Sequence, residues 1–167
     1  MRFYLLVALI LAALFFQVTL LNFISLWGVK PELVLIIVSF NAFLRGSREG
    51  ALVGFLAGLF ADLAMGSYIG LNALSLMAAG YLVGLTESKL YKDSVLIIMV
   101  LVWLSSFAAQ LLNYILLTMV DVYISPGVAL FNVILPSATY TALVAPLFYG
   151  SFYRSNQKGW LYVDSKI

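Results

Sequence analysis

Long apolar runs separated by short charged clusters are the feature that most restricts the fold of this 167-residue chain. Hydrophobic residues make up 64% of it and charged residues 10%. An average soluble protein has about 25% charged residues. Because so few polar residues cannot cover a water-soluble surface, the pattern predicts an all-α integral membrane protein that forms one domain.

The apolar runs predict six transmembrane helices, bounded by charges or by glycine and proline turns. The second run, of about 14 residues, gives only about 21 Å of helix against a hydrocarbon core of roughly 30 Å. That helix must thin the bilayer, extend into residues 25–27, or be shielded by its neighbours. Pro136 and Pro146 should kink the last helix. The predicted spans are 3–22, 31–44, 50–66, 69–86, 94–120 and 127–151, within a transmembrane domain of residues 1–151 that precedes a cytoplasmic tail at 152–167.

Lysine and arginine residues set the predicted orientation, because they concentrate in the cytoplasmic loops of membrane proteins. With the N-terminus inside, only Lys30 of the nine basic residues lies outside. Both termini are therefore expected in the cytoplasm, with the chain crossing the membrane six times. The basic residues on the inner side are Arg2, Arg45, Arg48, Lys89, Lys92, Arg154, Lys158 and Lys166.

Several classes of function are disfavoured by the residues that the chain lacks. It has no cysteine and no histidine, so thiol nucleophiles, thiolate metal sites and the commonest general base are missing. The basic residues are scattered, which disfavours nucleic-acid binding. We therefore expect a protein that is not an enzyme and that uses no cofactor and no metal.

One stretch of the third and fourth runs carries glycine or an acid at every fourth position. Residues four apart on a helix lie one above another, so the glycines form a groove without side chains. Such ridges allow two helices to approach closely. The sequence leaves open whether the facing helix belongs to this chain, to a second copy or to a partner protein. The residues are Gly50, Gly54, Gly58, Asp62, Gly66 and Gly70, and the spacing recurs at Gly80 and Gly84.

Asp62 needs a partner, because an acid near the centre of a membrane helix costs about 3 kcal/mol on the insertion scale. The first hypothesis is an ion pair with Lys30, the only basic residue on the same side. The second is hydrogen bonding from the backbone N–H groups of residues 66–70. A third interpretation is that Asp62 caps a turn near the membrane interface.

Other polar residues lie within the predicted spans or at their edges. For most of them we expect hydrogen bonds between helices, because a ligand cavity would need several to converge. Glu32 fits the first turn of the second helix, where a carboxylate meets the positive end of the helix dipole. The other polar residues are Gln17, Asn22, Asn41, Asn72, Ser75, Gln110, Asn113 and Asn132.

The segment from Gln17 through Trp27-Gly28-Val29-Lys30-Pro31-Glu32-Leu33 to the Gly50–Gly70 stretch resembles MreD, the rod shape-determining membrane protein family of bacteria. The resemblance covers the whole chain, its specific motif covers about residues 28–84, and it implies a multi-pass protein of the bacterial cytoplasmic (inner) membrane. The resemblance is carried by Pro31-Glu32-Leu33, Arg45-Gly46, the sequence GALVGFLAGLFADLAMG and Gly70-Leu71. The length and the weakly basic tail also fit. The resemblance implies the fold of the substrate-binding subunits of energy-coupling-factor transporters.

The function implied by this resemblance is a non-enzymatic scaffold of the cell-elongation machinery. MreD-like proteins act beside MreC, a single-span protein, and with MreB, RodA and a penicillin-binding transpeptidase. The alternative is the binding of a small ligand as a transporter subunit, which predicts that Asp62, Asn72 and neighbouring polar groups surround a cavity.

Overall fold

A computed structural model describes residues 2–19, 30–66, 68–86, 94–122 and 125–158, and no strand occurs among them. Helices occupy all six predicted stretches. Asn22, Lys89, Lys92 and Lys166 lie outside the described residues. The elements are α1 (Arg2–Thr19), α2 (Leu33–Arg45), α3 (Ser47–Met65), α4 (Leu71–Gly84), α5 (Val95–Met119), α6 (Pro126–Val128), the π-helix η1 (Ala129–Ile134) and α7 (Leu135–Lys158).

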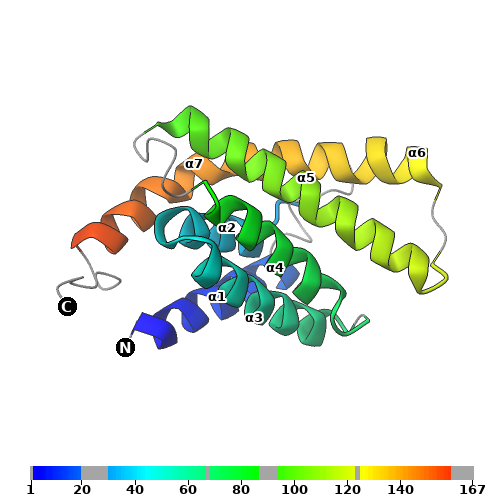
Figure 1. The fold of residues 1–167 in the computed structure, drawn as a ribbon, viewed down its shortest axis with the longest axis horizontal. Coiled ribbons are helices and arrows are strands. Elements are labelled where there is room, and N and C mark those ends of the chain that lie inside the picture. Colours follow the sequence, from blue (N-terminus) through cyan, green and yellow to red (C-terminus); the bar gives the residue numbers. More distant parts are fainter. Residues whose placement is uncertain (1, 20–29, 67, 87–93, 123–124, 159–167) are drawn as a thin grey trace.

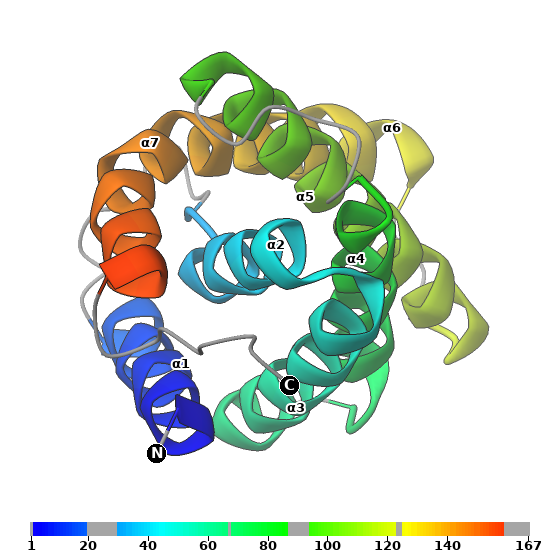
Figure 2. The same ribbon diagram turned by 60° about the vertical axis from the view of Figure 1, so that its left-hand side comes forward.

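The short second helix, α2, lies in the middle of the molecule, and the helices α1, α3, α4, α5 and α7 surround it (Figure 2). All ten residues from Val34 to Phe43 are buried. A helix that is apolar on every side is stable only when it is covered on every side. Of the three explanations for its shortness, shielding by neighbouring helices is therefore the one that the structure shows.

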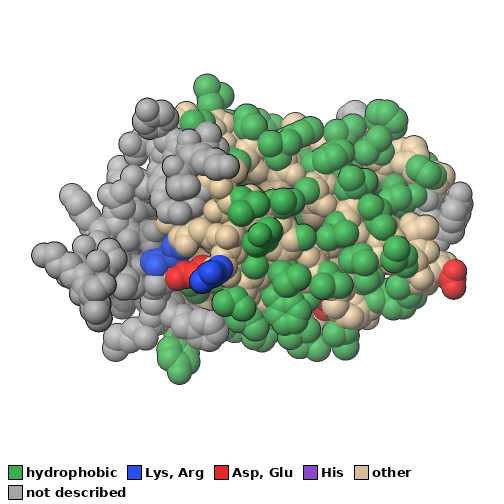
Figure 3. Space-filling view, viewed as in Figure 1, with side chains coloured by type: hydrophobic (Ala, Val, Ile, Leu, Met, Phe, Trp, Pro, Cys, Tyr) green, Lys and Arg blue, Asp and Glu red, His purple; other side chains and the backbone are tan. Residues whose placement is uncertain are grey.

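The helices run lengthwise, and both ends of the described chain lie at the same end of the molecule (Figure 1). We call the opposite end, which carries the α3–α4 and α5–α6 turns, the far end. Apolar side chains cover most of the visible surface between the two ends (Figure 3). Two helical stretches, Val95–Met119 and Pro126–Gly150, are long and apolar enough to cross a membrane. That all six helices do so stays a prediction.

Two boundaries and one stretch of backbone geometry differ from those expected. Helix α3 begins at Ser47 rather than at residue 50, so that only Gly46, with φ of 94°, separates it from α2. The last helix continues to Lys158, and the expected tail from residue 152 is therefore partly helical. The backbone also widens into the π-helix η1, directly before Pro136, where the Leu135 N–H donates to the Leu130 carbonyl. Proline has no N–H and crowds the preceding turn, which accounts for irregularity at this place.

The glycine ridge of α3 faces α4 of the same chain. A Cβ atom on Gly50, Gly54 or Gly58 would overlap the backbone of α4 at Gly80, Leu76 and Ala73 respectively. Along the same line Gly84 packs against Ser47, so the glycines of both helices contribute to one antiparallel contact. This answers the question that the sequence left open for these three glycines, because the facing helix is internal.

Asp62 closes this contact at the far end. Its side chain is fully buried. The carboxylate accepts hydrogen bonds from the backbone N–H groups of Gly70 (2.8 Å), Asn72 (3.2 Å) and Ala73 (3.3 Å), and from the Asn72 side-chain amide (2.8 Å). Within the described chain Lys30 is not among its partners. Backbone N–H donors were expected by the second hypothesis and by the turn-capping interpretation, and the hydrogen bonds agree with both. Gly70 is the only donor found among the described part of residues 66–70, and Asn72 and Ala73 are the others.

This arrangement explains how an acid is tolerated inside an apolar helix. The first N–H groups of a helix have no partner within that helix, and they mark its positive end. Asp62 supplies the acceptors for the first turn of α4 from a neighbouring helix. Gly66 and Gly70 allow the intervening turn, with φ of 63° and 107°, values that favour glycine.

Replacing Gly58 by alanine is expected to destabilise the protein strongly. The new Cβ would meet the α4 backbone, which cannot move aside as a side chain can, so the loss should reach or exceed the about 1–3 kcal/mol typical of overpacking. Gly127→Ala is the matched control, since a Cβ there meets nothing within 4 Å. Thermal denaturation in detergent measures both, and equal melting temperatures would contradict the packing described.

Replacing Asp62 by alanine leaves three N–H groups of α4 without their acceptor. Each buried unsatisfied group costs about 1–3 kcal/mol, so we expect a large drop in the melting temperature or a loss of folded protein. Asp62→Asn should be milder, because one acceptor oxygen remains. Asp121→Asn, at an exposed acid, is the control. A stable Asp62→Ala protein would show that these hydrogen bonds are dispensable.

Candidate functional site

The predicted site residues fall into two structural groups. Gly50, Gly54, Gly58 and Asp62 are buried in the α3–α4 contact, while Gly66 and Gly70 form the turn that joins these helices. Together they are a helix-packing feature, and a role in partner binding stays a prediction. The last predicted residue, Lys30, precedes α2, and its backbone carbonyl accepts a hydrogen bond from the Ser137 hydroxyl (3.4 Å).

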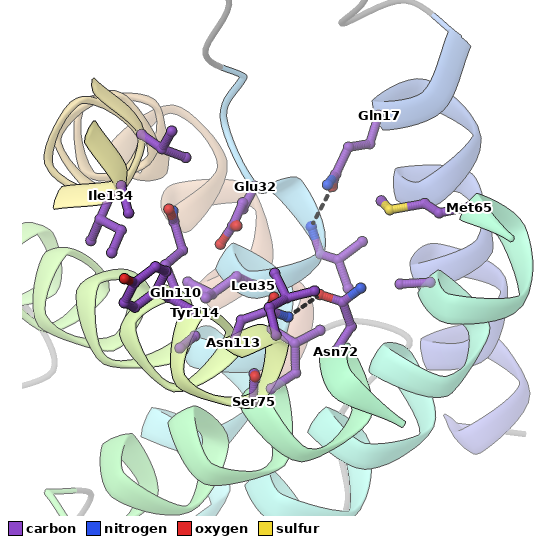
Figure 4. Close-up of a pocket in the computed structure, with 17 residues that line it drawn as sticks. Gln17, Glu32, Leu35, Met65, Asn72, Ser75, Gln110, Asn113, Tyr114 and Ile134 are labelled. Carbon is purple, nitrogen blue, oxygen red and sulfur yellow. Dashed lines mark hydrogen bonds between the residues drawn. The ribbon is translucent and has the colours of Figure 1, made fainter. Parts of the chain in front are cut away.

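A cavity of about 300 Å³ lies at the far end of the bundle (Figure 4). Its walls come from the last turns of α1 and α3, the start of α2 and α4, the second half of α5, and η1. Its volume is at the lower end of the range for ligand pockets, about 300–1,000 Å³. The polar residues that line it are Gln17, Glu32, Asn72, Ser75, Gln110, Asn113 and Tyr114.

One hydrogen-bond chain leads from Asp62 to the cavity. The Asn72 side-chain amide donates to Asp62, so its oxygen is left as an acceptor, and the Asn113 amide nitrogen donates to that oxygen (3.0 Å). Because each amide nitrogen donates along this chain, the orientation of both amides is fixed. The carbonyl oxygen of Asn113 is left without a protein donor in the described chain.

A second chain fixes Gln110 in the same way. Its amide nitrogen donates to the hydroxyls of Ser137 (2.7 Å) and Ser106 (3.3 Å). Ser137 donates onward to the Lys30 carbonyl, and Ser106 is hydrogen-bonded to the Glu32 carboxylate. The Gln110 carbonyl oxygen is therefore left over, as in Asn113.

Glu32 is the residue whose role was not recognised from the sequence. It lies at the N-cap position of α2, just before the first turn in which it was expected, and its side chain makes no capping hydrogen bond. Its carboxylate instead points toward the middle of the cavity (Figure 4). Its backbone N–H donates to the Thr141 hydroxyl (3.1 Å), which ties the start of α2 to α7.

The outcome for the other polar residues is mixed. Gln17, Asn72, Gln110 and Asn113 bond to other helices, as expected. Ser75 bonds to the Leu71 carbonyl of its own helix. The buried Asn41 nitrogen has no partner in the described chain, and Asn132 is exposed. Five of these side chains nevertheless converge on the cavity, which is the condition stated for a ligand site.

The chemistry available in the cavity is that of binding. No group of three or more histidine, cysteine, aspartate or glutamate side chains that could hold a metal ion occurs in the described part of the chain. One carboxylate and several amides, set in apolar walls, can orient a polar group of a small molecule.

Comparison with known proteins identifies the family. The family model described as rod shape-determining protein MreD matches residues 1–156. No curated protein and no solved structure matches the chain. The match covers nearly all of the 167 residues. The all-helical architecture and the apolar exterior agree with this membrane-associated family of shape-determining proteins. The chain belongs to the MreD family.

Proposed function

We propose that this protein is a membrane scaffold of the cell-elongation machinery, which binds an MreC-like single-span protein and links it to enzymes of peptidoglycan synthesis. The observation that carries the proposal is the family match over residues 1–156, since the family acts in rod-shape determination and is not a known enzyme family. MreB, RodA and a penicillin-binding transpeptidase are further proposed neighbours, on the basis of the resemblance.

The partner's transmembrane helix would have to meet an outer face of the bundle, because the glycine ridge is occupied by α4. Helix α1 is the first candidate. Within the described chain it packs only against α2 and α3. It buries a single stripe, and large apolar side chains such as Leu11 and Phe15 remain exposed (46% and 66%).

Truncating these two side chains in Leu11→Ala/Phe15→Ala is expected to lower the amount of MreC-like protein that co-purifies by at least about tenfold, since large exposed anchors carry most of an interface energy. Leu104→Ala/Leu111→Ala on α5 is the matched control, because these residues are also exposed. Failure of the wild type to hold any MreC-like protein would refute the scaffold function. If co-purification of the MreC-like protein were lost only in the α5 variant, the interface would lie on α5 and not on α1.

We further propose that the six helices cross the bacterial inner membrane with both termini in the cytoplasm. The support is the lysine and arginine distribution and the lengthwise arrangement of the helices with both ends of the described chain at one end. Short helices such as α2 and α4 would be accommodated by shielding from their neighbours.

This orientation predicts the labelling of single cysteines, and the chain has no native cysteine to interfere. Ser125→Cys, in the exposed α5–α6 turn, should react with a membrane-impermeant maleimide added to intact spheroplasts. Arg48→Cys, which is also exposed, should react only after permeabilisation. Labelling of Arg48→Cys from outside would contradict the orientation.

Binding of a small ligand, as in a transporter subunit, is the second candidate function. The observation that favours it is the polar-lined cavity at the far end. The likeness to the substrate-binding subunit fold is part of this proposal.

A further inference from the structure

The cavity presents acceptor atoms that the described part of the chain leaves unused. The Asn113 and Gln110 carbonyl oxygens are left over by the two hydrogen-bond chains, which turn both amide nitrogens toward protein acceptors. Both residues line the cavity. A site with fixed amide orientations discriminates ligands by their donors, because a ligand without donors would leave these oxygens unpaired.

Glu32 adds a negative charge to these acceptors. Its carboxylate is hydrogen-bonded to the Ser106 hydroxyl, which lies behind the cavity wall, and within the described chain no basic side chain forms an ion pair with it. A carboxylate enclosed by helices and paired only with a hydroxyl is complementary to a cation that brings its own hydrogen-bond donors.

Gln17 supplies the opposite polarity at the edge of the same cavity. Its carbonyl oxygen accepts from the Val34 N–H (3.3 Å), so its amide nitrogen is the group left for a ligand (Figure 4). Between these polar groups the walls are apolar, including Leu35, Leu76 and Ile134. A ligand that matches these groups has a cationic donor for the acceptors, an oxygen acceptor for Gln17, and a small volume.

We propose that this cavity binds the primary ammonium group of an amino alcohol, with the ammonium between Glu32, Gln110 and Asn113 and a neighbouring oxygen at Gln17. Two sources share this chemistry, namely the ethanolamine headgroup of a membrane phospholipid and a free amino alcohol. The proposal rests on the second candidate function, small-ligand binding, and names its ligand class. It does not depend on the scaffold function, because binding is measured on the protein without partners.

The test uses purified full-length protein in nanodiscs of phosphatidylglycerol, whose headgroup carries hydroxyls and no ammonium. In one arm about a third of the lipid is replaced by phosphatidylethanolamine. In the other arm free ethanolamine is added, with ethylene glycol as the neutral match. A ligand that binds only the folded state raises the melting temperature, here by about 5 °C near saturation.

Matched variants separate binding from a general effect of the lipid. Glu32→Gln keeps the size of the side chain and removes its charge, and it should abolish the increase. Glu32→Asp keeps the charge and should retain part of it. Glu49→Gln, a partly exposed acid near the opposite end, should behave like the wild type.

Some outcomes identify the source of the ammonium group, and others overturn the proposal. An increase with phosphatidylethanolamine alone identifies the lipid headgroup, and an increase with ethanolamine alone identifies a free amine. Equal increases with ethanolamine and ethylene glycol, or no increase in either arm of the wild type, would overturn the ammonium site. So would an unchanged increase in Glu32→Gln. If Glu32→Gln does not fold, the ethanolamine and ethylene glycol comparison in the wild type decides.

Discussion

The close contact between α3 and α4 is the interaction on which the other features depend. Glycines at Gly50, Gly54 and Gly58 bring the two backbones together, and this places the first turn of α4 over Asp62. The carboxylate then satisfies N–H groups that an isolated helix leaves unpaired. The glycine ridge of α3, which on its own could be a binding surface for another protein, thus sets the register of α4 against α3.

That register also reaches the cavity. Asn72 lies in the first turn of α4, and its side-chain nitrogen donates to Asp62. Its side-chain oxygen therefore faces Asn113 on α5 and accepts a hydrogen bond from the Asn113 amide. On the opposite wall Glu32, at the start of α2, is held by Thr141 on α7. Helix α2 is surrounded by the bundle, so the position of its first residues is determined by several neighbours at once. The cavity is therefore bounded by groups with little freedom to rearrange.

Much of the fold could be predicted from the sequence because it depends on local pattern. Apolar runs located the helices, and the four-residue spacing of glycine predicted a close helix contact. The same spacing recurs at Gly80 and Gly84, on the helix that the structure shows to be the facing one, but the sequence alone did not identify that helix. The first hypothesis for Asp62 proposed Lys30 because of its formal charge, whereas the donors found in the described chain are backbone amides and the Asn72 side chain. The dipole of α2 gave a sufficient explanation for Glu32 in the sequence. The cavity that Glu32 lines is formed by several helices, so it could be recognised only from their packing.

The π-helical segment η1 has a consequence for chain length. Ala129 and Ile134 are buried five residues apart, whereas the buried positions that follow, at Ala138 and Ala142, recur every fourth residue. One residue is thus accommodated as a wider turn, and the faces on either side stay in phase. A relative with one residue fewer between Ala129 and Ile134 could form an ordinary α-helical turn there and still bury the same positions. Deletion of one residue within η1 would therefore leave the buried positions in phase, while a deletion elsewhere in α5 or α7 would turn buried positions toward the exterior of the bundle.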